Sequence, residues 1–198
     1  LENALWDLHK QGMRSLIIDL RGNPGGLLTA SVEVADKFIA DGGIVSTRGR
    51  SEPENFSYRA HRPGTWRVPL VVLIDGDSAS ASEIFAGAIQ DYRRGIVLGQ
   101  QTFGKGTVQN LVPLDGYAKK PVNGQLTVTI GKFYRVTGES TQLRGVAPDV
   151  PLASLIDLKD VGESALDEAL PWDRIPGVPF RAAPGEGVMP AVLANEEG

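Results

Sequence analysis

The sequence contains no cysteine among its 198 residues and only two histidines, His9 and His61. The absence of cysteine excludes disulfides, thiolate catalysis and cysteine-ligated metal sites. Neither histidine lies in a motif that would place it beside a nucleophile, and the sequence has no G-x-S-x-G turn of the kind that carries the serine in many hydrolases. If the chain is a hydrolase, its general base is therefore expected to be another type of residue.

Long apolar runs and clusters of basic residues are also missing. The run at residues 68–74, VPLVVLI, is far shorter than the roughly 20 residues that span a bilayer. The 20 lysines and arginines stand against 24 aspartates and glutamates, which gives a net charge of −4 without any basic block. This balance gives no reason to expect nucleic acid or anionic lipid as a partner.

The length of the chain suits one hydrophobic core. We expect that core to cover residues 1–175, followed by a loosely packed tail rich in proline, glycine and alanine at 176–198. The first residues have a helical pattern and include no initiator Met, so we expect a piece of a longer protein, in which any targeting signal would lie upstream.

A strand–turn–helix pattern occurs twice in the chain. The apolar runs at 15–20 and 68–75 are typical of strands buried on both faces. Each is followed by a turn and then by a segment with apolar residues at helical spacing, 27–40 and 81–94. The repeated pattern predicts an α/β domain with a mixed sheet. Other predicted elements are helices at 1–12 and 162–170, strands at 42–48, 95–99, 107–114 and 125–136, and a surface loop at 49–67.

The second turn carries three serines at alternate positions in the sequence DSASASE, residues 77–83. Ser80 and Glu83 have the spacing of a capping box, in which the serine only satisfies helix amides. The position also suits a hydrolase nucleophile, because a buried strand leads to it and the helix amino end presents free amides to a negative charge. The pattern is compatible with both roles of Ser80.

Lys105 is the best candidate for a base among the lysines. A lysine can accept a proton if its amine is neutral, and removal from water disfavours its charged form. In the sequence TFGKGTVQNL, Lys105 has a glycine on either side and no acidic residue within several positions. The alternative is an ordinary solvated lysine between two flexible glycines.

Both residues belong to a longer stretch, DGDSASASEIFAGAIQDYRRGIVLGQQTFGKGTVQ, that resembles the signature of the carboxyl-terminal processing peptidases, or tail-specific proteases. Ser80 and Lys105 lie 25 positions apart (105 − 80), which is the separation of nucleophile and base in that family. The resemblance extends to IIDLRGNPGG upstream and to KFYRVTGESTQLRGVAPDV and EALPWD downstream. It covers most of residues 15–173, and the last of these motifs are most similar to the bacterial periplasmic branch.

The resemblance implies a role for each matching residue. Ser80 would be the nucleophile and Lys105 the general base, in the Ser-Lys version of serine hydrolysis. Gln109 would orient the lysine, and the backbone amides of Gly26 and Ala81 would stabilise the oxyanion of the intermediate. The implied fold is a ClpP/crotonase-like spiral of strand-strand-helix units.

Two of the matching positions raise questions of distance. In a regular strand, residues four apart share a face but lie roughly 13 Å from each other. Gln109 can therefore touch Lys105 only if the chain turns between them. Asp91 lies roughly 16 Å along a helix from Ser80, so we expect a structural role for it, in a pair with Arg93 or Arg94.

The predicted function is that of a serine endopeptidase that cleaves proteins near their carboxyl terminus without a cofactor or metal. The resemblance implies protein substrates with nonpolar tails, a periplasmic location and room for an adaptor protein. It also implies a PDZ module for gripping the substrate tail, and this chain contains no sequence of that kind.

Two other functions fit the same residues. A crotonase-like acyl-coenzyme A enzyme would use the two backbone amides to hold a thioester oxyanion and would not need Ser80. A non-catalytic binding domain could keep the fold of a protease without its activity. Replacing Ser80 by alanine separates a peptidase from the acyl-coenzyme A enzyme, because only the peptidase would lose turnover.

Overall fold

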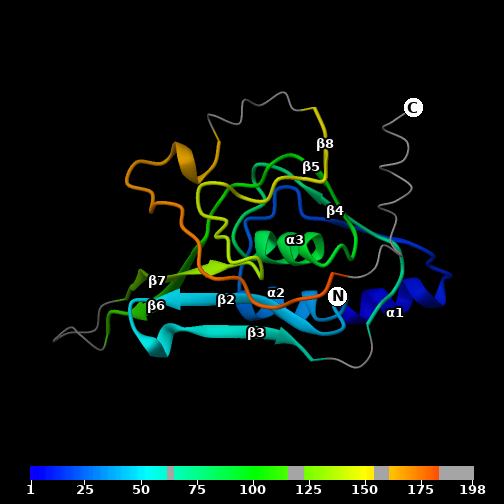
Figure 1. Cartoon of the computed structure of the whole chain (residues 1–198), viewed down its shortest axis with the longest axis horizontal. Helices are drawn as coiled ribbons and strands as arrows, with labels where there is room; N and C mark the ends of the chain where they lie inside the picture. Colours follow the sequence, from blue (N-terminus) through cyan, green and yellow to red (C-terminus); the bar gives the residue numbers. More distant parts are fainter. Residues whose placement is uncertain (62–64, 116–122, 154–160, 183–198) are drawn as a thin grey trace.

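Two four-stranded sheets enclose a pair of helices in the computed structural model, which describes residues 1–61, 65–115, 123–153 and 161–182 (Figure 1). One sheet is parallel, with the order β1-β4-β5-β8, and the other is antiparallel, with the order β3-β2-β7-β6. The parallel sheet contains β1 (Leu16–Asp19), β4 (Leu70–Ile74), β5 (Ile96–Gly99) and β8 (Val150–Pro151). The antiparallel sheet contains β2 (Gly42–Gly49), β3 (Phe56–Ala60), β6 (Thr107–Pro113) and β7 (Gln125–Tyr134). The predicted α/β class is confirmed, and the two kinds of strand pairing lie in separate sheets.

The helices are α1 (Glu2–Lys10), α2 (Leu28–Ala35) and α3 (Ala81–Asp91), with short 3₁₀ turns at Glu52–Glu54 and Glu163–Ala165. Helix α3 lies between the two sheets and beside α2 (Figure 1). Its residues from Ala81 to Ile89 are all buried. A helix that is buried on every side lies within a core, and α3 forms the centre of this one.

The parallel register brings two turns of the chain together. Strand β1 pairs with β4 so that Asp19 lies opposite Leu73. The carboxyl ends of both strands therefore reach the same edge of the sheet. There the amide of Gly22 donates to the Asp75 carboxylate at 3.0 Å. The turn that follows β1 and the turn that follows β4 are thus fixed to each other.

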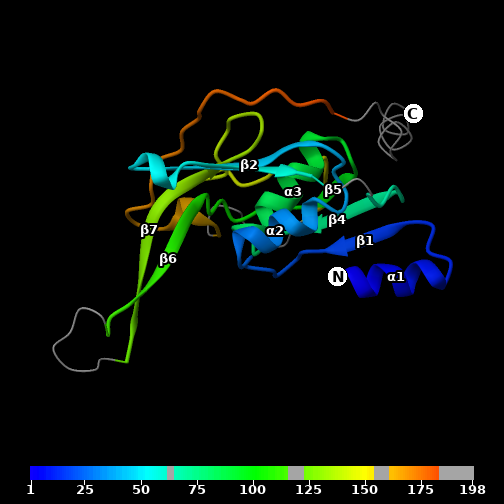
Figure 2. The same ribbon diagram turned by 90° about the horizontal axis from the view of Figure 1, so that it is seen from below.

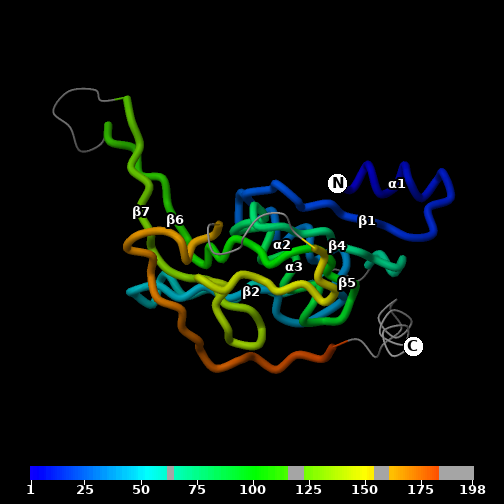
Figure 3. Tube along the Cα trace, turned by 90° about the horizontal axis from the view of Figure 1, so that it is seen from above, coloured from blue at the N-terminus to red at the C-terminus, as the bar shows by residue number. Residues whose placement is uncertain are grey.

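Strands β6 and β7 form a long hairpin. Figures 2 and 3 show it extending beyond the rest of the molecule, on the side away from α1. The pairing of the two strands shifts its register between Val108 and Gln109. Such a bulge bends a strand and changes the direction of its side chains.

Two predicted elements were wrong. The segment 49–67 was predicted as a surface loop, but Phe56–Ala60 forms β3 and pairs with β2. The prolines and charges of the segment suggested a loop, whereas the neighbouring strand and the packing of Phe56 on Tyr58, with ring centroids 6.3 Å apart, stabilise a strand. The helix predicted at 162–170 is limited to the short 3₁₀ turn, because Leu166, the residue after it, is extended with φ −87° and ψ 136°, and Glu168 has a positive φ of 61°.

Part of the predicted tail is described. The amide of Val178 donates to the carbonyl of Val136 at 2.9 Å. The ring of Phe180 packs on that of Tyr92, with centroids 5.5 Å apart. Residues 183–198 of the predicted tail lie outside the described residues.

Candidate active site

Ser80 occupies a strained turn between β4 and α3. Its backbone has φ 56° and ψ −114°, a combination that non-glycine residues rarely adopt and that costs about 1–3 kcal/mol. A sharp turn of this kind, from a strand into a helix, exposes the nucleophilic serine of α/β-hydrolases. The local sequence lacks the glycine motif of those enzymes, yet it produces a comparable turn.

The three serines of the turn differ in what their hydroxyl groups do. Ser78 donates to the carbonyl of Leu20 at 2.8 Å, and Ser82 donates to the carbonyl of Asn23 at 3.0 Å. Both hydroxyls therefore tie the turn after β4 to the turn after β1. The hydroxyl of Ser80 donates to no described residue. Ser80 is thus the one serine of the three whose proton is available to another group.

A pocket of about 260 Å³ opens beside Ser80. All five residues predicted for the site line it: Gly26, Ser80, Ala81, Lys105 and Gln109. The rest of its wall is largely apolar and is formed by Leu27, Leu28, Ile84, Thr107, Val108, Leu111, Thr127 and Phe133. The structure therefore brings together residues that are far apart in the sequence, around a cavity that could admit a peptide side chain.

Lys105 and Gln109 are in direct contact. The Lys105 Nζ donates to the Gln109 Oε1 at 3.1 Å, and the Gln109 Nε2 donates to the Thr129 hydroxyl at 3.3 Å. The separation of roughly 13 Å expected for residues four apart in a regular strand does not apply to Lys105 and Gln109. Lys105 precedes the first residue of β6, and the bulge before Gln109 redirects its side chain.

Two backbone amides in the pocket have no hydrogen-bond acceptor. Within the described part of the chain, the N–H groups of Gly26 and Ala81 donate to no protein atom. Ala81 is buried and Gly26 is exposed, and unpaired amides at a helix start favour an anion. The arrangement is chemically suited to stabilising a developing oxyanion.

Gly25 is a site residue that the sequence reasoning missed. A Cβ atom at this position would lie 2.5 Å from the Ala79 carbonyl oxygen and 2.7 Å from the Ala81 nitrogen. Gly25 also has a φ of +97°. Only a glycine allows the turn after β1 to approach the amide of Ala81 so closely, whereas a Cβ on Gly26 would point into open space.

Glu83 connects the serine turn to the lysine loop. Its side chain is 0% exposed. Its Oε2 accepts hydrogen bonds from the amides of Ser80 and Lys105, at 2.7 and 2.9 Å. Its Oε1 accepts from the Thr102 hydroxyl and the Gly104 amide, at 2.6 and 2.8 Å. The carboxylate that the sequence predicted as a helix cap therefore also fixes the backbone of both candidate catalytic residues.

Burial has a clear electrostatic effect on Glu83. Removal from water raises the pKa of its carboxyl group to about 7, and the hydrogen bonds from Thr102 and from the backbone amides of Ser80, Gly104 and Lys105 partly oppose this rise. Nothing in the sequence other than the capping-box spacing marked this residue, because its other partners come from a loop about 20 positions away.

Asp91 has a structural partner other than the one predicted. Its carboxylate binds the Nη2 and Nε of Arg135 at 2.6 and 3.0 Å, and neither Arg93 nor Arg94 forms an ion pair with it. The prediction of the partner was wrong because Arg135 follows β7, and only the folded chain brings it to the end of α3. Burial raises the pKa of Asp91, and Arg135 opposes that rise.

Other candidate groups lie away from the pocket. The His9 ring packs against Trp6 and Trp66, and the His61 Nδ1 lies 3.4 Å from an Asp36 carboxylate oxygen. Neither histidine lines the pocket. Among the described residues, no group of histidines, aspartates and glutamates could hold a metal ion, and no helix is long and apolar enough to cross a membrane.

The chain is similar to several known proteins. Residues 1–152 match the family described as Peptidase family S41. The chain is 45% identical over 183 residues to the tail-specific protease of Haemophilus influenzae, covering 91% of this chain and 26% of that protein. It is also 45% identical over 139 residues to the carboxy-terminal-processing protease of Bartonella bacilliformis, covering 70% of this chain and 31% of that protein.

The chain also has the same fold as a solved structure with a similar sequence. The photosystem II D1 C-terminal processing protease superposes with a TM-score of 0.64 and is 36% identical, over 76% of this chain and 37% of that one. The chain therefore spans between 26% and 37% of the length of these three proteins.

Proposed function

Because this chain belongs to peptidase family S41, we propose that it is the catalytic core of a serine endopeptidase that cleaves proteins near their carboxyl terminus. The observation that carries the proposal is one pocket. It contains a serine with an available hydroxyl, a lysine held by a glutamine, and two unpaired backbone amides. An acyl-coenzyme A enzyme would use the amides but would leave the lysine–glutamine pair without a role.

The proposed reaction begins with proton transfer. The unprotonated amine of Lys105 takes the proton of the Ser80 hydroxyl as its oxygen attacks the scissile carbonyl carbon. The amides of Gly26 and Ala81 donate to the oxygen on which negative charge develops. The protonated Lys105 then gives its proton to the leaving amine, and an ester of Ser80 with the new carboxyl end remains.

Water completes the cycle by the same route. The Lys105 amine takes a proton from a water molecule, the hydroxide attacks the ester, and the proton returns to the Ser80 oxygen. Gln109 is a positioning residue in this scheme, because its oxygen accepts a Lys105 N–H and restricts the amine to the pocket. Losing one oxyanion donor in such a site typically costs about 10²–10³ in rate.

The substrate would bind as an extended strand. Among the described strands β6 pairs only with β7, so its outer edge is free, and the pocket lies along it. A peptide added to this edge would form main-chain hydrogen bonds and place alternate side chains toward the pocket. The apolar wall formed by Leu28, Ile84 and Phe133 supports a preference for nonpolar residues.

The test combines labelling and cleavage. A fluorophosphonate probe should label the chain at Ser80, and labelling and peptide cleavage should both disappear in Ser80→Ala and fall strongly in Lys105→Ala. The controls are Ser57→Ala and Lys10→Ala, which change exposed residues outside the pocket. Labelling that persists in Lys105→Ala, or cleavage that persists in Ser80→Ala, would refute the assignment.

Location and partners form the finer part of the proposal. We infer that the protein is periplasmic and that it cleaves substrates with nonpolar tails. We also infer that an adaptor protein delivers these substrates. The bacterial relatives and the apolar pocket support this inference. Cell fractionation tests the location, and peptides that end in charged residues should be cut more slowly than matched nonpolar ones.

A further inference from the structure

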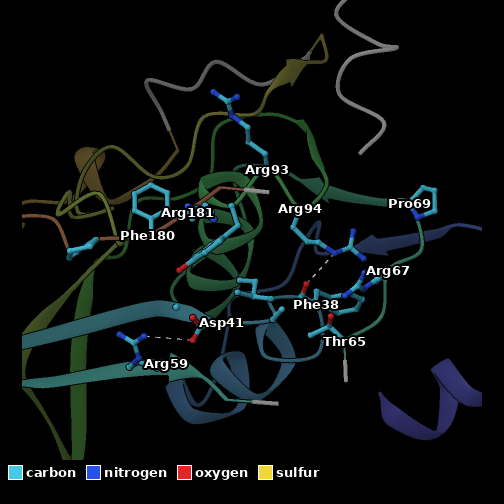
Figure 4. Close-up of a pocket in the computed structure, with 15 residues that line it drawn as sticks. Phe38, Asp41, Arg59, Thr65, Arg67, Pro69, Arg93, Arg94, Phe180 and Arg181 are labelled. Atoms are coloured by element: carbon cyan, nitrogen blue, oxygen red, sulfur yellow. Dashed lines mark hydrogen bonds and ion pairs between the residues drawn. The ribbon is translucent and has the colours of Figure 1, made fainter. Parts of the chain in front are cut away.

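A second and larger cavity lies at the opposite end of α3 from Ser80. Its volume is about 760 Å³, and it shares no lining residue with the pocket beside Ser80. Its inner wall includes the aromatic residues Phe38, Tyr92 and Phe180. The residues of this cavity come from the chain directly after α2 and α3, the start of β2, strand β3, the chain that leads into β4 and the segment after Val178 (Figure 4).

The cavity is strongly basic although the whole chain is acidic. Five arginines line it against a single acidic residue, Asp41. The arginines are Arg59, Arg67, Arg93, Arg94 and Arg181. In a chain with a net charge of −4, this concentration of positive charge is a local feature that favours an anionic partner.

Only some of these arginines are used by the fold. Arg94 donates to the carbonyls of Phe38 and Val68, and Arg59 lies 3.7 Å from Asp41. Within the described part of the chain, no ion pair or side-chain hydrogen bond involves the other three. Those three, which are exposed, are Arg67, Arg93 and Arg181.

Arg93 occupies a backbone position whose conformation favours glycine. Helix α3 ends in a Schellman motif, in which the Arg93 amide donates to Gln90 and the Arg94 amide donates to Ile89. The residue after the helix cap, Arg93, has a φ of 50°. The left-handed conformation is unfavourable for a residue with a Cβ atom. An arginine at this position therefore lowers the stability of the fold relative to a glycine. The attraction of a cation to the helix end offsets part of that cost.

We propose that this cavity binds an acidic, extended segment of another protein that carries an aromatic side chain. Figure 4 shows the labelled arginines around several sides of the cavity rather than converging on one point. Such a distribution suits a row of carboxylates better than one compact anion. The aromatic wall gives a nonpolar side chain a place to pack, and arginine forks bind carboxylates in a fixed geometry.

The experiment measures binding in the Ser80→Ala background, so that its result does not depend on the proposed peptidase activity. The probe is a short fluorescent peptide of glutamate and aspartate around a central phenylalanine, and the readout is fluorescence anisotropy. Binding should weaken as salt is added. Reversing the charge of both Arg93 and Arg181 to glutamate should weaken it roughly tenfold or more.

Matched variants separate the cavity from general charge and from stability. Arg50→Glu, at an exposed arginine that does not line the cavity, should leave the affinity nearly unchanged. Arg93→Gly should weaken binding several-fold while raising Tm, because glycine relieves the left-handed strain. A variant that is more stable and yet binds less well cannot be explained by loss of fold.

Several outcomes would overturn the proposal. One is equal weakening by Arg50→Glu and by the double reversal. Another is equal binding of a peptide in which lysines replace the acidic residues. Displacement of the probe by inorganic phosphate at matched concentration and ionic strength would identify a compact-anion site instead. Concentration-dependent dimers that the double reversal abolishes would identify a second copy of the chain as the occupant.

Discussion

Replacing Glu83 by glutamine tests whether this buried carboxylate holds the two halves of the site together. Glutamine keeps the shape but exchanges one acceptor oxygen for a donor NH₂ group. The amide can turn this group toward Thr102, whose hydroxyl oxygen can accept, and so keep its oxygen facing the amides of Ser80 and Lys105. The Gly104 amide then loses its acceptor. One buried unsatisfied donor costs about 1–3 kcal/mol, which is the destabilisation expected below about pH 4.5, where the native carboxyl group is neutral as well.

Alanine at the same position should be far more damaging. Glu83→Ala leaves all four donors without an acceptor and opens a cavity. At about 1 kcal/mol or more for each donor, the loss is roughly 4 kcal/mol or larger, which is comparable with the whole stability of many domains. We therefore expect Glu83→Gln to fold and retain part of its labelling at Ser80, and Glu83→Ala to lose both.

The pH dependence gives a sharper test of Glu83. Its folded pKa of about 7 lies above the ordinary value of 4.5, so the folded state binds more protons between these values. The stability that the neutral carboxyl contributes is fully present below about pH 4.5 and is lost as the pH rises through about 7. Relative to Glu83→Gln, the native chain should therefore lose up to roughly 3 kcal/mol of unfolding free energy across this range.

Urea unfolding at a series of pH values measures this difference. Glu52→Gln, at an exposed glutamate, is the control and should leave the pH dependence of the native chain unchanged. A constant difference between the native chain and Glu83→Gln from about pH 4.5 to pH 8 would show that Glu83 does not titrate there. Equal stability of the two at every pH would refute the claim that its hydrogen bonds hold the site.

Three other substitutions test separate contacts. Gly25→Ala should lower both stability and fluorophosphonate labelling, because its Cβ would overlap the backbone of the serine turn. Gln109→Ala should lower kcat by roughly tenfold with little change in KM or Tm, because it removes the side chain that positions Lys105. Asp91→Asn should destabilise the chain by about 3–5 kcal/mol in a denaturant titration, because Arg135 would keep a half-buried charge without its partner.

Each of these has a matched control. Gly12→Ala strains a positive φ without any close neighbour, Asn110→Ala changes an exposed residue next to Gln109, and Asp7→Asn removes an exposed carboxylate. If a control variant loses as much stability or activity as the variant it is matched with, the contact named for that variant is not the cause of the loss. A Gln109→Ala enzyme with an unchanged kcat would remove Gln109 from the proposed mechanism.

Local patterns in the sequence predicted the parts of the fold that depend on neighbouring residues. The apolar runs of β1 and β4 and the helical spacing of α3 are of this kind. The candidate pair Ser80 and Lys105 came from the turn, the glycines and a family resemblance, and both residues line one pocket.

Long-range contacts account for what the sequence did not predict. Strand β3 is stabilised by pairing with β2, and the partner of Asp91 arrives from beyond β7. The role of Glu83 depends on amides in a loop that only the fold brings near, and backbone amides leave no trace in side-chain patterns. The contact of Gln109 with Lys105 depends on a bulge that the alternation of residues does not reveal.

The free outer edge of β6 also has a consequence for the behaviour of the chain in concentrated solution. Its unpaired N–H and C=O groups can pair with any strand, including the same edge of another molecule. Leu111 on β6 and Leu126 on β7 are 64% and 53% exposed, so an encounter of two hairpins would also bury apolar surface. A lysine in place of Leu111 should therefore slow aggregation, in the way that charged side chains protect the edges of many natural sheets.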